Sequence, residues 1–374
     1  MGRQFSGDGR KLPRWGLLLA LVPALAMGQA ADAPGAPDAP VSAKQPVFEV
    51  LPAAISVAPG LVLHGLGPLI AGDVPLAKTL FVVEGTGLVL LVGAGAPIYL
   101  SGQTRQLAGP LYALALTGAG LFSVSALANL YVALGPAFPP GVAPLRLPRL
   151  EVEAGYQHVV DASFPRRQAF VSLGAVARVE RVRWEAGARV SPGDGNLRVR
   201  AGGAYRWLGA PEGALGAADG TALDVEAAAL VHRFPSEGYT LGGGEVFLRG
   251  RYALARVSPR LAGSFAELGL GLALQRLSFV GLGAEDGLED ELLFTAGYGV
   301  YLGRGGPLRG EAMLYYDHRK DDFPGAVKSA GRVPLGYFGL RGRVLLTERW
   351  GLSAEVQAGS AWVGRLSLVR ALAP

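Results

Sequence analysis

Six arginines in two neighbouring segments are the residues of this chain best suited to act on a charged solute. They are Arg181, Arg183, Arg189, Arg198, Arg200 and Arg206, and the glutamates that share their alternation are Glu151, Glu153 and Glu185. Side chains that alternate with a period of two share one face of a β-strand. A row of arginines on one face attracts anions, whereas pairing with the glutamates would fill an enclosed interior with salt bridges. The sequence leaves both interpretations open.

Hydrolysis is the main alternative chemistry, because a histidine beside a serine and an acid can activate a nucleophile. His158, His232 and His318 are the candidate bases, and Asp317 precedes the last of them. However, the chain has no Gly-x-Ser-x-Gly segment, and adjacent residues of a strand point to opposite faces. The four histidines lack the spacing of metal ligands, and there are no cysteines. We therefore predict no catalytic residue, no metal site and no cofactor.

The arginines belong to a long C-terminal region in which apolar and polar residues alternate, as they do in β-strands. Between residues 181 and 191, for example, Val182, Trp184 and Ala186 share one face. The pattern predicts twelve strands, with ten as the alternative. Their ranges are 149–160, 168–180, 181–191, 197–208, 222–234, 244–255, 264–277, 291–303, 309–319, 335–346, 350–358 and 361–369. Many have the roughly 9–11 residues that a tilted strand needs to cross a bilayer, and single-chain bacterial barrels have even strand numbers.

Aromatic residues gather near the ends of these strands, as rings do at the headgroup level of a membrane. The six that best fit such a girdle are Trp184, Tyr205, Trp207, Tyr298, Trp350 and Trp362. Short links also tend to alternate with long ones along the region, which is typical of outer-membrane barrels. The rival fold is a soluble β-sandwich or lipocalin-like barrel, which would bury its aromatic residues in mid-strand.

Residues 48–135 carry very few charges and contain two long apolar runs, Leu76–Leu100 and Ala108–Leu134. Each run is long enough to cross a membrane as a helix and is rich in small residues that allow helices to pack closely. We expect an antiparallel helical hairpin that lies outside the barrel wall or at its periplasmic mouth. Glu84 interrupts the first run, and we expect it near a helix end or facing protein.

Residues 1–30 have the basic start, short apolar centre and small residues of a secretory signal peptide. A Pro/Ala-rich linker follows at 31–47, and a Pro-rich break at 136–148 separates the hairpin from the barrel region, 149–374. The signal segment holds four basic residues and one acid, so its removal lowers the formal net charge from +5 to about +2. No clustered basic face is left for nucleic acid, which we exclude as a partner.

On this pattern, residues 149–374 resemble the proteobacterial outer-membrane β-barrel class. The resemblance implies an all-β, transmembrane, antiparallel up-and-down barrel of about twelve strands, preceded by the apolar α-helical hairpin. It identifies no subfamily, because it rests on a pattern and not on a motif. The chain ends Ala371-Leu372-Ala373-Pro374, without the terminal aromatic residue that such barrels usually carry.

The resemblance further implies a location in the outer membrane, with the lipid bilayer as the principal partner. The leading interpretation is a non-enzymatic barrel. It would be either a passive narrow pore whose arginines prefer small anionic solutes or a structural surface barrel. Two alternatives are an outer-membrane lipid hydrolase and a surface adhesin or complex-forming barrel whose helical hairpin docks an envelope protein partner.

Overall fold

A computed structural model describes most of the chain from residue 60 onward. The described residues are 60, 62–100, 105–134, 147–161, 167–212, 219–235, 239–279, 287–302, 309–319, 336–359 and 361–373. The segments predicted as signal peptide and linker, 1–30 and 31–47, lie outside the described residues, as does most of the Pro-rich break.

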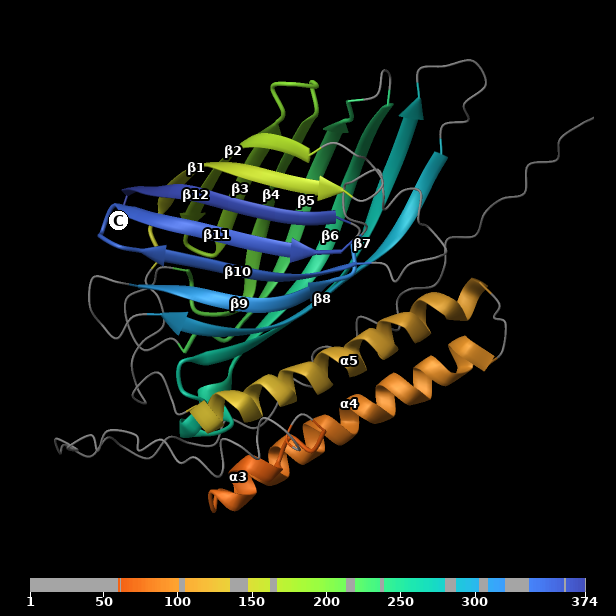
Figure 1. Cartoon of the computed structure of the whole chain (residues 1–374), viewed down its shortest axis with the longest axis vertical. Coiled ribbons are helices and arrows are strands. Elements are labelled where there is room, and N and C mark those ends of the chain that lie inside the picture. The colour runs from red at the N-terminus through yellow and green to blue at the C-terminus, as the bar shows by residue number, and fades with distance from the viewer. Residues whose placement is uncertain are drawn as a thin grey trace, which may run out of the picture.

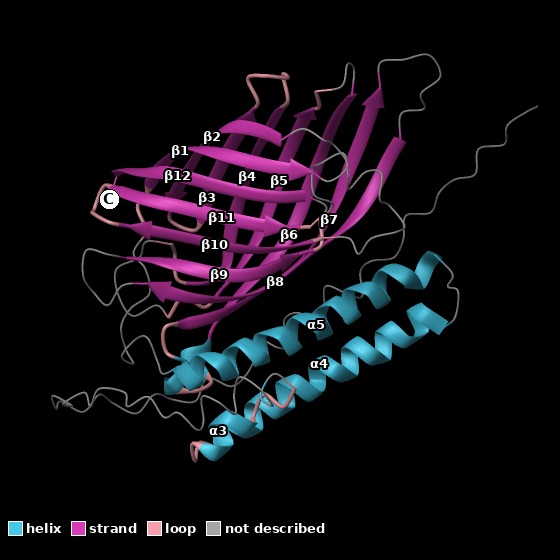
Figure 2. Cartoon of the chain, viewed as in Figure 1, coloured by secondary structure: helices cyan, strands magenta, loops and turns pink. Residues whose placement is uncertain are grey.

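Twelve antiparallel strands close into a barrel, in which each strand pairs with its sequence neighbours and β1 pairs with β12 (Figures 1 and 2). The strands are β1 Leu150–Asp161, β2 Arg167–Val179, β3 Val182–Val190, β4 Leu197–Gly209, β5 Ala222–Arg233, β6 Tyr239–Ala253, β7 Ser264–Phe279, β8 Gly287–Leu302, β9 Arg309–Asp317, β10 Tyr337–Leu345, β11 Trp350–Ala358 and β12 Ala361–Ala373. The prediction of a closed twelve-stranded up-and-down barrel is confirmed. Closure gives every strand two neighbouring strands, although residues 287–294 of β8 extend beyond β9 and pair with β7 alone.

Apolar and polar residues alternate along the strands, and successive strand residues point to opposite faces. The barrel therefore has a polar inside and an apolar outside. On β4, Arg200 reaches the inward carboxylate of Glu245 on β6, while Val199 is exposed on the outside. On β7, Glu267 is buried inside and Leu274 is exposed outside. A slip of one residue would exchange the two faces, so the pattern fixes the register.

One end of the barrel carries the start of β1 and the end of β12, where Leu150 pairs with Ala373. We call it the termini end. The tight turn between β2 and β3 lies there, as do the two 3₁₀ helices η3 Leu254–Arg256 and η4 Pro259–Leu261 between β6 and β7. The turn between β3 and β4 lies at the opposite end, where Asp194 Oδ1 accepts the backbone N–H of Asn196 at 3.1 Å and Gly195 has a φ of +71°. The Pro, Gly, Asp and Asn residues of segment 191–196 are of the types that favour such a turn.

Among the described residues, three helices precede the barrel: α3 Leu66–Ile70, α4 Val74–Leu100 and α5 Arg105–Leu134. The long helices α4 and α5 form the predicted hairpin, which lies outside the barrel with α5 against the wall and α4 farther out (Figure 1). The helix axes approach closely at Gly87 and Gly118. A Cβ atom at Gly118 would lie 2.5 Å from the carbonyl oxygen of Gly87. Small residues at helix contacts are typical of helices that pack in lipid.

The hairpin is fixed to the barrel along β7 and β8. Tyr131 Oη donates to the carbonyl oxygen of Ala262, just before β7, at 2.6 Å. The Tyr131 ring lies 6.2 Å from that of Tyr298 on β8, within a buried cluster that includes Leu76, Leu80 and Leu261. These contacts place the C-terminal part of α5 at the termini end of the barrel.

Candidate functional site: the charged barrel lumen

The barrel encloses a polar cavity of about 600 Å³. Among the described residues, twelve arginines and nine carboxylates line it. The arginines are Arg178, Arg183, Arg189, Arg198, Arg200, Arg206, Arg249, Arg251, Arg319, Arg341, Arg343 and Arg365; the acids are Glu153, Glu185, Glu212, Asp224, Glu226, Glu267, Glu311, Asp317 and Glu355. Paired charges therefore fill much of the lumen, with a small excess of positive charge.

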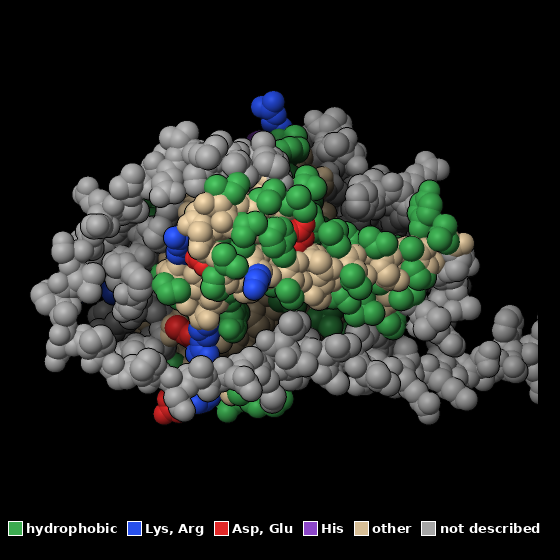
Figure 3. Space-filling model, turned by 90° about the horizontal axis from the view of Figure 1, so that it is seen from below, with side chains coloured by type: hydrophobic (Ala, Val, Ile, Leu, Met, Phe, Trp, Pro, Cys, Tyr) green, Lys and Arg blue, Asp and Glu red, His purple; other side chains and the backbone are tan. Residues whose placement is uncertain are grey.

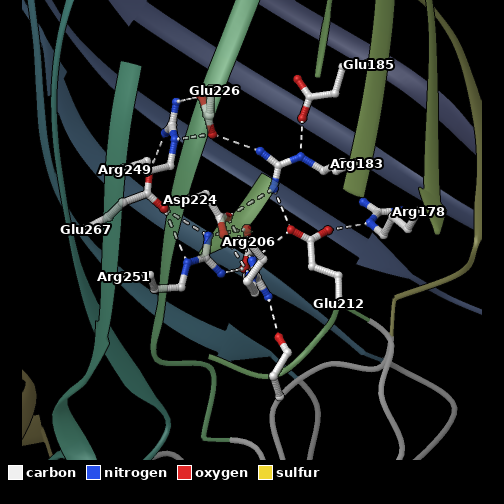
Figure 4. Close-up of polar contacts among 12 residues, drawn as sticks. Arg178, Arg183, Glu185, Arg206, Glu212, Asp224, Glu226, Arg249, Arg251 and Glu267 are labelled. Atoms are coloured by element: carbon white, nitrogen blue, oxygen red, sulfur yellow. Dashed lines mark hydrogen bonds and ion pairs between the residues drawn. The ribbon is translucent and has the colours of Figure 1, made fainter. Parts of the chain in front are cut away.

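Glu212 is the centre of a knot of ion pairs at the termini end. It lies in the connection between β4 and β5, and its carboxylate turns back into the lumen (Figure 4). Arg178 Nε donates to Glu212 Oε2 at 2.8 Å, and Arg183 Nη1 and Arg206 Nη2 donate to Oε1 at 2.5 and 2.9 Å. Burial alone would raise the pKa of the Glu212 carboxyl, but the three arginines lower it to about 2. Glu212 is therefore ionised at neutral pH and joins strands β2, β3 and β4.

A second knot surrounds Glu267 on β7, which is buried in the lumen. It pairs with Arg249 at 2.6 Å and Arg251 at 3.0 Å on the neighbouring strand β6, and with Arg341 on β10 at 3.3 Å. Arg251 also reaches Glu311 on β9 at 2.8 Å. β7 and β10 are three strands apart, and so are β6 and β9. The Glu267–Arg341 and Arg251–Glu311 contacts therefore cross the lumen instead of following the wall.

The two knots are linked through Glu226 on β5. Its Oε1 accepts from Arg183 Nη2 at 2.9 Å and from Arg249 Nε at 2.9 Å. Asp224, two residues earlier on the same face, accepts from Arg206 at 2.7 Å. Figure 4 shows the resulting chain of alternating charges from Arg178 to Arg251. Such a network holds each side chain in place through several partners.

An arginine-rich pocket of about 270 Å³ adjoins the cavity on the side of β1 to β4. Five arginines line it, namely Arg189, Arg198, Arg200, Arg343 and Arg365, together with Glu151, Glu153 and Glu185. Glu151 is already engaged, with Arg343 and with Arg178, the latter at 3.2 Å. The lining of the pocket thus holds five arginines and three glutamates.

The predicted lumen residues lie in different surroundings. Arg183 and Arg206 belong to the Glu212 knot, whereas Arg189, Arg198 and Arg200 line the arginine-rich pocket. Arg181 lies in the turn between β2 and β3, where its guanidinium contacts the backbone oxygens of Arg206 and Trp207. Glu151, Glu153 and Glu185 all face the pocket. Glu185 pairs with Arg183 at 2.6 Å.

Five of the six predicted girdle residues are exposed on the outside of the barrel. Trp184, Tyr205, Trp207 and Trp350 lie toward the termini end, and Trp362 lies at the opposite end. The sixth, Tyr298, also points outward but is buried beneath α5, where it packs against Tyr131. Its ring therefore meets protein, which the alternation of β8 alone could not indicate.

The candidate histidines are dispersed. His232 is buried on the inner face, with Nε2 2.8 Å from Asn196 Oδ1 and its ring stacked on Phe234 at 3.8 Å. His318 Nδ1 contacts the hydroxyl of Tyr316 at 2.8 Å, whereas the adjacent Asp317 pairs with Arg319. His158 lies on β1, in the outward-facing register of Tyr156. Within the described part of the chain, no group of three or more His, Cys, Asp or Glu side chains could hold a metal ion.

Several lumen residues were not predicted. Asp224 and Glu226, Arg249 and Arg251, and Arg341 and Arg343 form alternating charged pairs on inward faces. Their spacing resembles that of the predicted arginine row, so alternation could have identified them. Glu212 is different, because it lies in a connecting segment where no periodicity links it to the lumen.

No known protein family matches the sequence. No curated protein matches it either. Among solved structures, the chain is similar to the KdgM porin (10% identity, 58% of this chain and 98% of that chain, TM-score 0.32). It is also similar to the NanC porin (11%, 60% and 100%, 0.36) and to the β domain of the Bordetella autotransporter BrkA (16%, 60% and 98%, 0.33). The chain's assignment to the β-barrel class rests on its own closed strand order.

Proposed function

We propose that this chain is an outer-membrane β-barrel that forms a narrow, constricted pore for small anionic solutes. The observation that carries the proposal is the arginine-rich pocket inside a closed barrel. Positive side chains confined within low-dielectric walls raise the local concentration of anions. Because guanidinium groups stay charged at physiological pH, the preference would hold over the whole neutral range.

The membrane location is supported by the outer surface of the barrel. Large apolar side chains are exposed around its circumference, among them Val199 on β4, Val231 on β5, Leu340 on β10 and Leu366 on β12. Soluble proteins rarely expose continuous apolar surface of this extent, whereas lipid requires it. If the barrel has the usual orientation, the termini end faces the periplasm.

The network of ion pairs limits what such a pore can conduct. A cavity of about 600 Å³ crossed by the Glu267 contacts leaves room for water and small ions, not for large polar molecules. The cavity lining has three more arginines than carboxylates, and the buried Glu151 and Glu245, which pair with Arg343 and Arg200, reduce this excess further. We therefore expect a low conductance and a modest anion preference.

The same network favours a second candidate, a structural barrel without transport. The Glu212 knot joins β2, β3 and β4 at one end, and the Glu267 contacts join β7 to β10. If water cannot pass these groups, the lumen serves only to stabilise the wall.

Planar-bilayer recordings under a salt gradient distinguish the two candidates. A pore of the proposed kind gives a reversal potential on the anion side. It should move toward zero in Arg198→Gln/Arg200→Gln, which removes two charges from the pocket. A preference for cations, or no conductance from protein that shows the heat-dependent gel shift of a folded barrel, would contradict the pore and leave the structural role.

A further inference from the structure

The helical hairpin has one side on the barrel and another with no partner among the described residues. The helix α5 lies between β8 and α4. On α4, the side chains of Val82, Val89 and Val92 are 67%, 71% and 61% exposed. Figure 3 looks onto this side of the molecule, where hydrophobic side chains and backbone make up most of the described surface. An apolar helix face of this length is not stable against water.

The contacts of α5 with the barrel wall show at which height along the barrel the hairpin lies. A Cβ atom at Gly120 would lie 2.7 Å from Cβ of Ala296 and 3.5 Å from the ring of Phe294. Both residues belong to the middle of β8 and face outward. Any element in contact with the outer wall at mid-strand lies at the level of the hydrocarbon core, if the barrel spans the membrane.

The hairpin has few charged residues, as expected for helices at the level of the hydrocarbon core. Between Lys78 and Arg105 the sequence has a single charged residue, Glu84, and between Arg105 and Leu134 it has none. Glu84 is 4% exposed, and its Oε2 accepts the backbone N–H of His64 at 2.9 Å. The imidazole of His64 is buried beside it, against the Phe122 ring at 4.5 Å. The hairpin thus places its one carboxylate inside and its valines outside, the reverse of a helix pair in water.

The length of the two helices and the continuity of the exposed apolar surface also favour a lipid environment. Val74–Leu100 and Gly109–Leu134 are long and apolar enough to cross a membrane, with mean hydropathies of 1.8 and 1.7. At 1.5 Å per residue, each exceeds the roughly 30 Å of a hydrocarbon core. The apolar surface is also continuous, because exposed Leu314 on β9 pairs with Tyr298 of β8, which α5 covers, and exposed Leu340 on β10 pairs with Leu314.

We propose that the α4–α5 hairpin is embedded in the same bilayer as the barrel. The helix α5 is seated on β7 and β8, and the outer face of α4 contacts lipid acyl chains. The inference rests on the proposed membrane location of the barrel. It makes the membrane-spanning body of this protein a composite of strands and helices, in which the hairpin replaces lipid along one part of the wall.

Spin labels test this directly, because the chain has no cysteine of its own. Single cysteines would replace Val89 on α4, Leu340 on the barrel wall and Glu348 in the exposed turn between β10 and β11, in the full chain reconstituted into phosphatidylcholine/phosphatidylglycerol vesicles. Collisions with oxygen report lipid, and collisions with a water-soluble nickel chelate report water. We expect Val89→Cys to match Leu340→Cys, with a gain in oxygen collisions and a loss of nickel collisions relative to Glu348→Cys. The heat-dependent gel shift verifies that each variant is folded.

The other outcomes distinguish the inference about the hairpin from the proposed membrane location of the barrel. If Leu340→Cys reports lipid while Val89→Cys reports water, the hairpin lies outside the bilayer and the inference is overturned, although the membrane barrel stands. A label at Val89 that is immobilised and shielded from both reagents would mean that protein, not lipid, covers α4, which also overturns it. If Leu340→Cys itself reports water, the membrane location fails and the inference fails with it.

Discussion

Arg206 and Glu212 are six residues apart in the chain, and inside the lumen Arg206 Nη2 lies 2.9 Å from Glu212 Oε1. The contact brings the connection between β4 and β5 back into the barrel, where Arg178 and Arg183 hold the same carboxylate. One acidic side chain thereby lies among three arginines inside the termini end of the lumen. It is the point at which a single substitution should change conduction most.

Replacing Glu212 with glutamine removes the charge that holds three arginines together. Glu212→Gln should raise the single-channel conductance and strengthen the anion preference, because the loosened guanidinium groups remain in the pathway. Recordings in symmetrical salt give the first quantity, and the reversal potential in a gradient gives the second. Glu348→Gln removes an exposed carboxylate at the same end and serves as the matched control. Equal conductance of both variants and the parent chain would show that Glu212 does not constrict the lumen.

The same carboxylate predicts a pH dependence. The pKa of Glu212 in the folded protein is about 2, below its ordinary value of 4.5. A depressed pKa means that the knot contributes its full stabilisation above about pH 4.5 and loses it as the pH falls through about 2. Conductance should therefore not respond to Glu212 between pH 7 and 4, and should rise as the pH falls through about 2 and the carboxyl is protonated.

Other carboxylates also titrate at low pH, so the comparison with Glu212→Gln isolates this group. Parent and variant should differ at pH 7 and converge only as the pH falls through about 2. Convergence already near pH 4.5, the ordinary value of a glutamate carboxyl, would contradict a lowered pKa for Glu212.

The strands could be predicted because alternation is a local property, and the errors lie where pairing extends a strand beyond its pattern. β6 begins at Tyr239, five residues before the predicted start, because Tyr239 and Thr240 pair with the end of β7 although Gly242-Gly243-Gly244 indicates a turn. β8 likewise begins at Gly287 because its acidic first residues pair with β7. In both places the neighbouring strand, and not the local sequence, decides the boundary.

The site was predictable only in part, for a related reason. Periodicity assigns Arg200 to the inner face, but its partner Glu245 lies two strands away. The partner of Arg341, Glu267, lies across the lumen. A one-dimensional pattern shows which face a charge occupies and not which opposite charge it meets. The predicted excess of arginines therefore shrinks once the inward acids of β5 to β11 are included.

The close contact between Gly87 and Gly118 should contribute to the stability of the α4–α5 helix pair. Gly118→Val would place atoms where the backbone of α4 lies, so we expect a loss of roughly 1–3 kcal/mol in the stability of the helix pair. Gly85→Ala is the control on α4, because a Cβ atom there meets nothing within 4 Å, and it should stabilise the helix by up to about 1 kcal/mol. Thermal melts followed by circular dichroism at 222 nm report the helices. Equal melting curves for the two variants would contradict the close packing.

The exposed apolar surface of the barrel should not tolerate a charged side chain. Leu340 lies in the middle of β10, between Leu314 on β9 and Val356 on β11, and its side chain is 55% exposed. If this surface meets hydrocarbon near the bilayer midplane, Leu340→Arg should cost roughly 2–4 kcal/mol of folding free energy. Glu348→Arg introduces the same side chain in an exposed turn and should cost much less, because that turn lies in water. Reversible urea unfolding in lipid vesicles, followed by tryptophan fluorescence, measures both values. A loss at Leu340 no larger than that at Glu348 would mean that the exposed apolar face does not contact lipid.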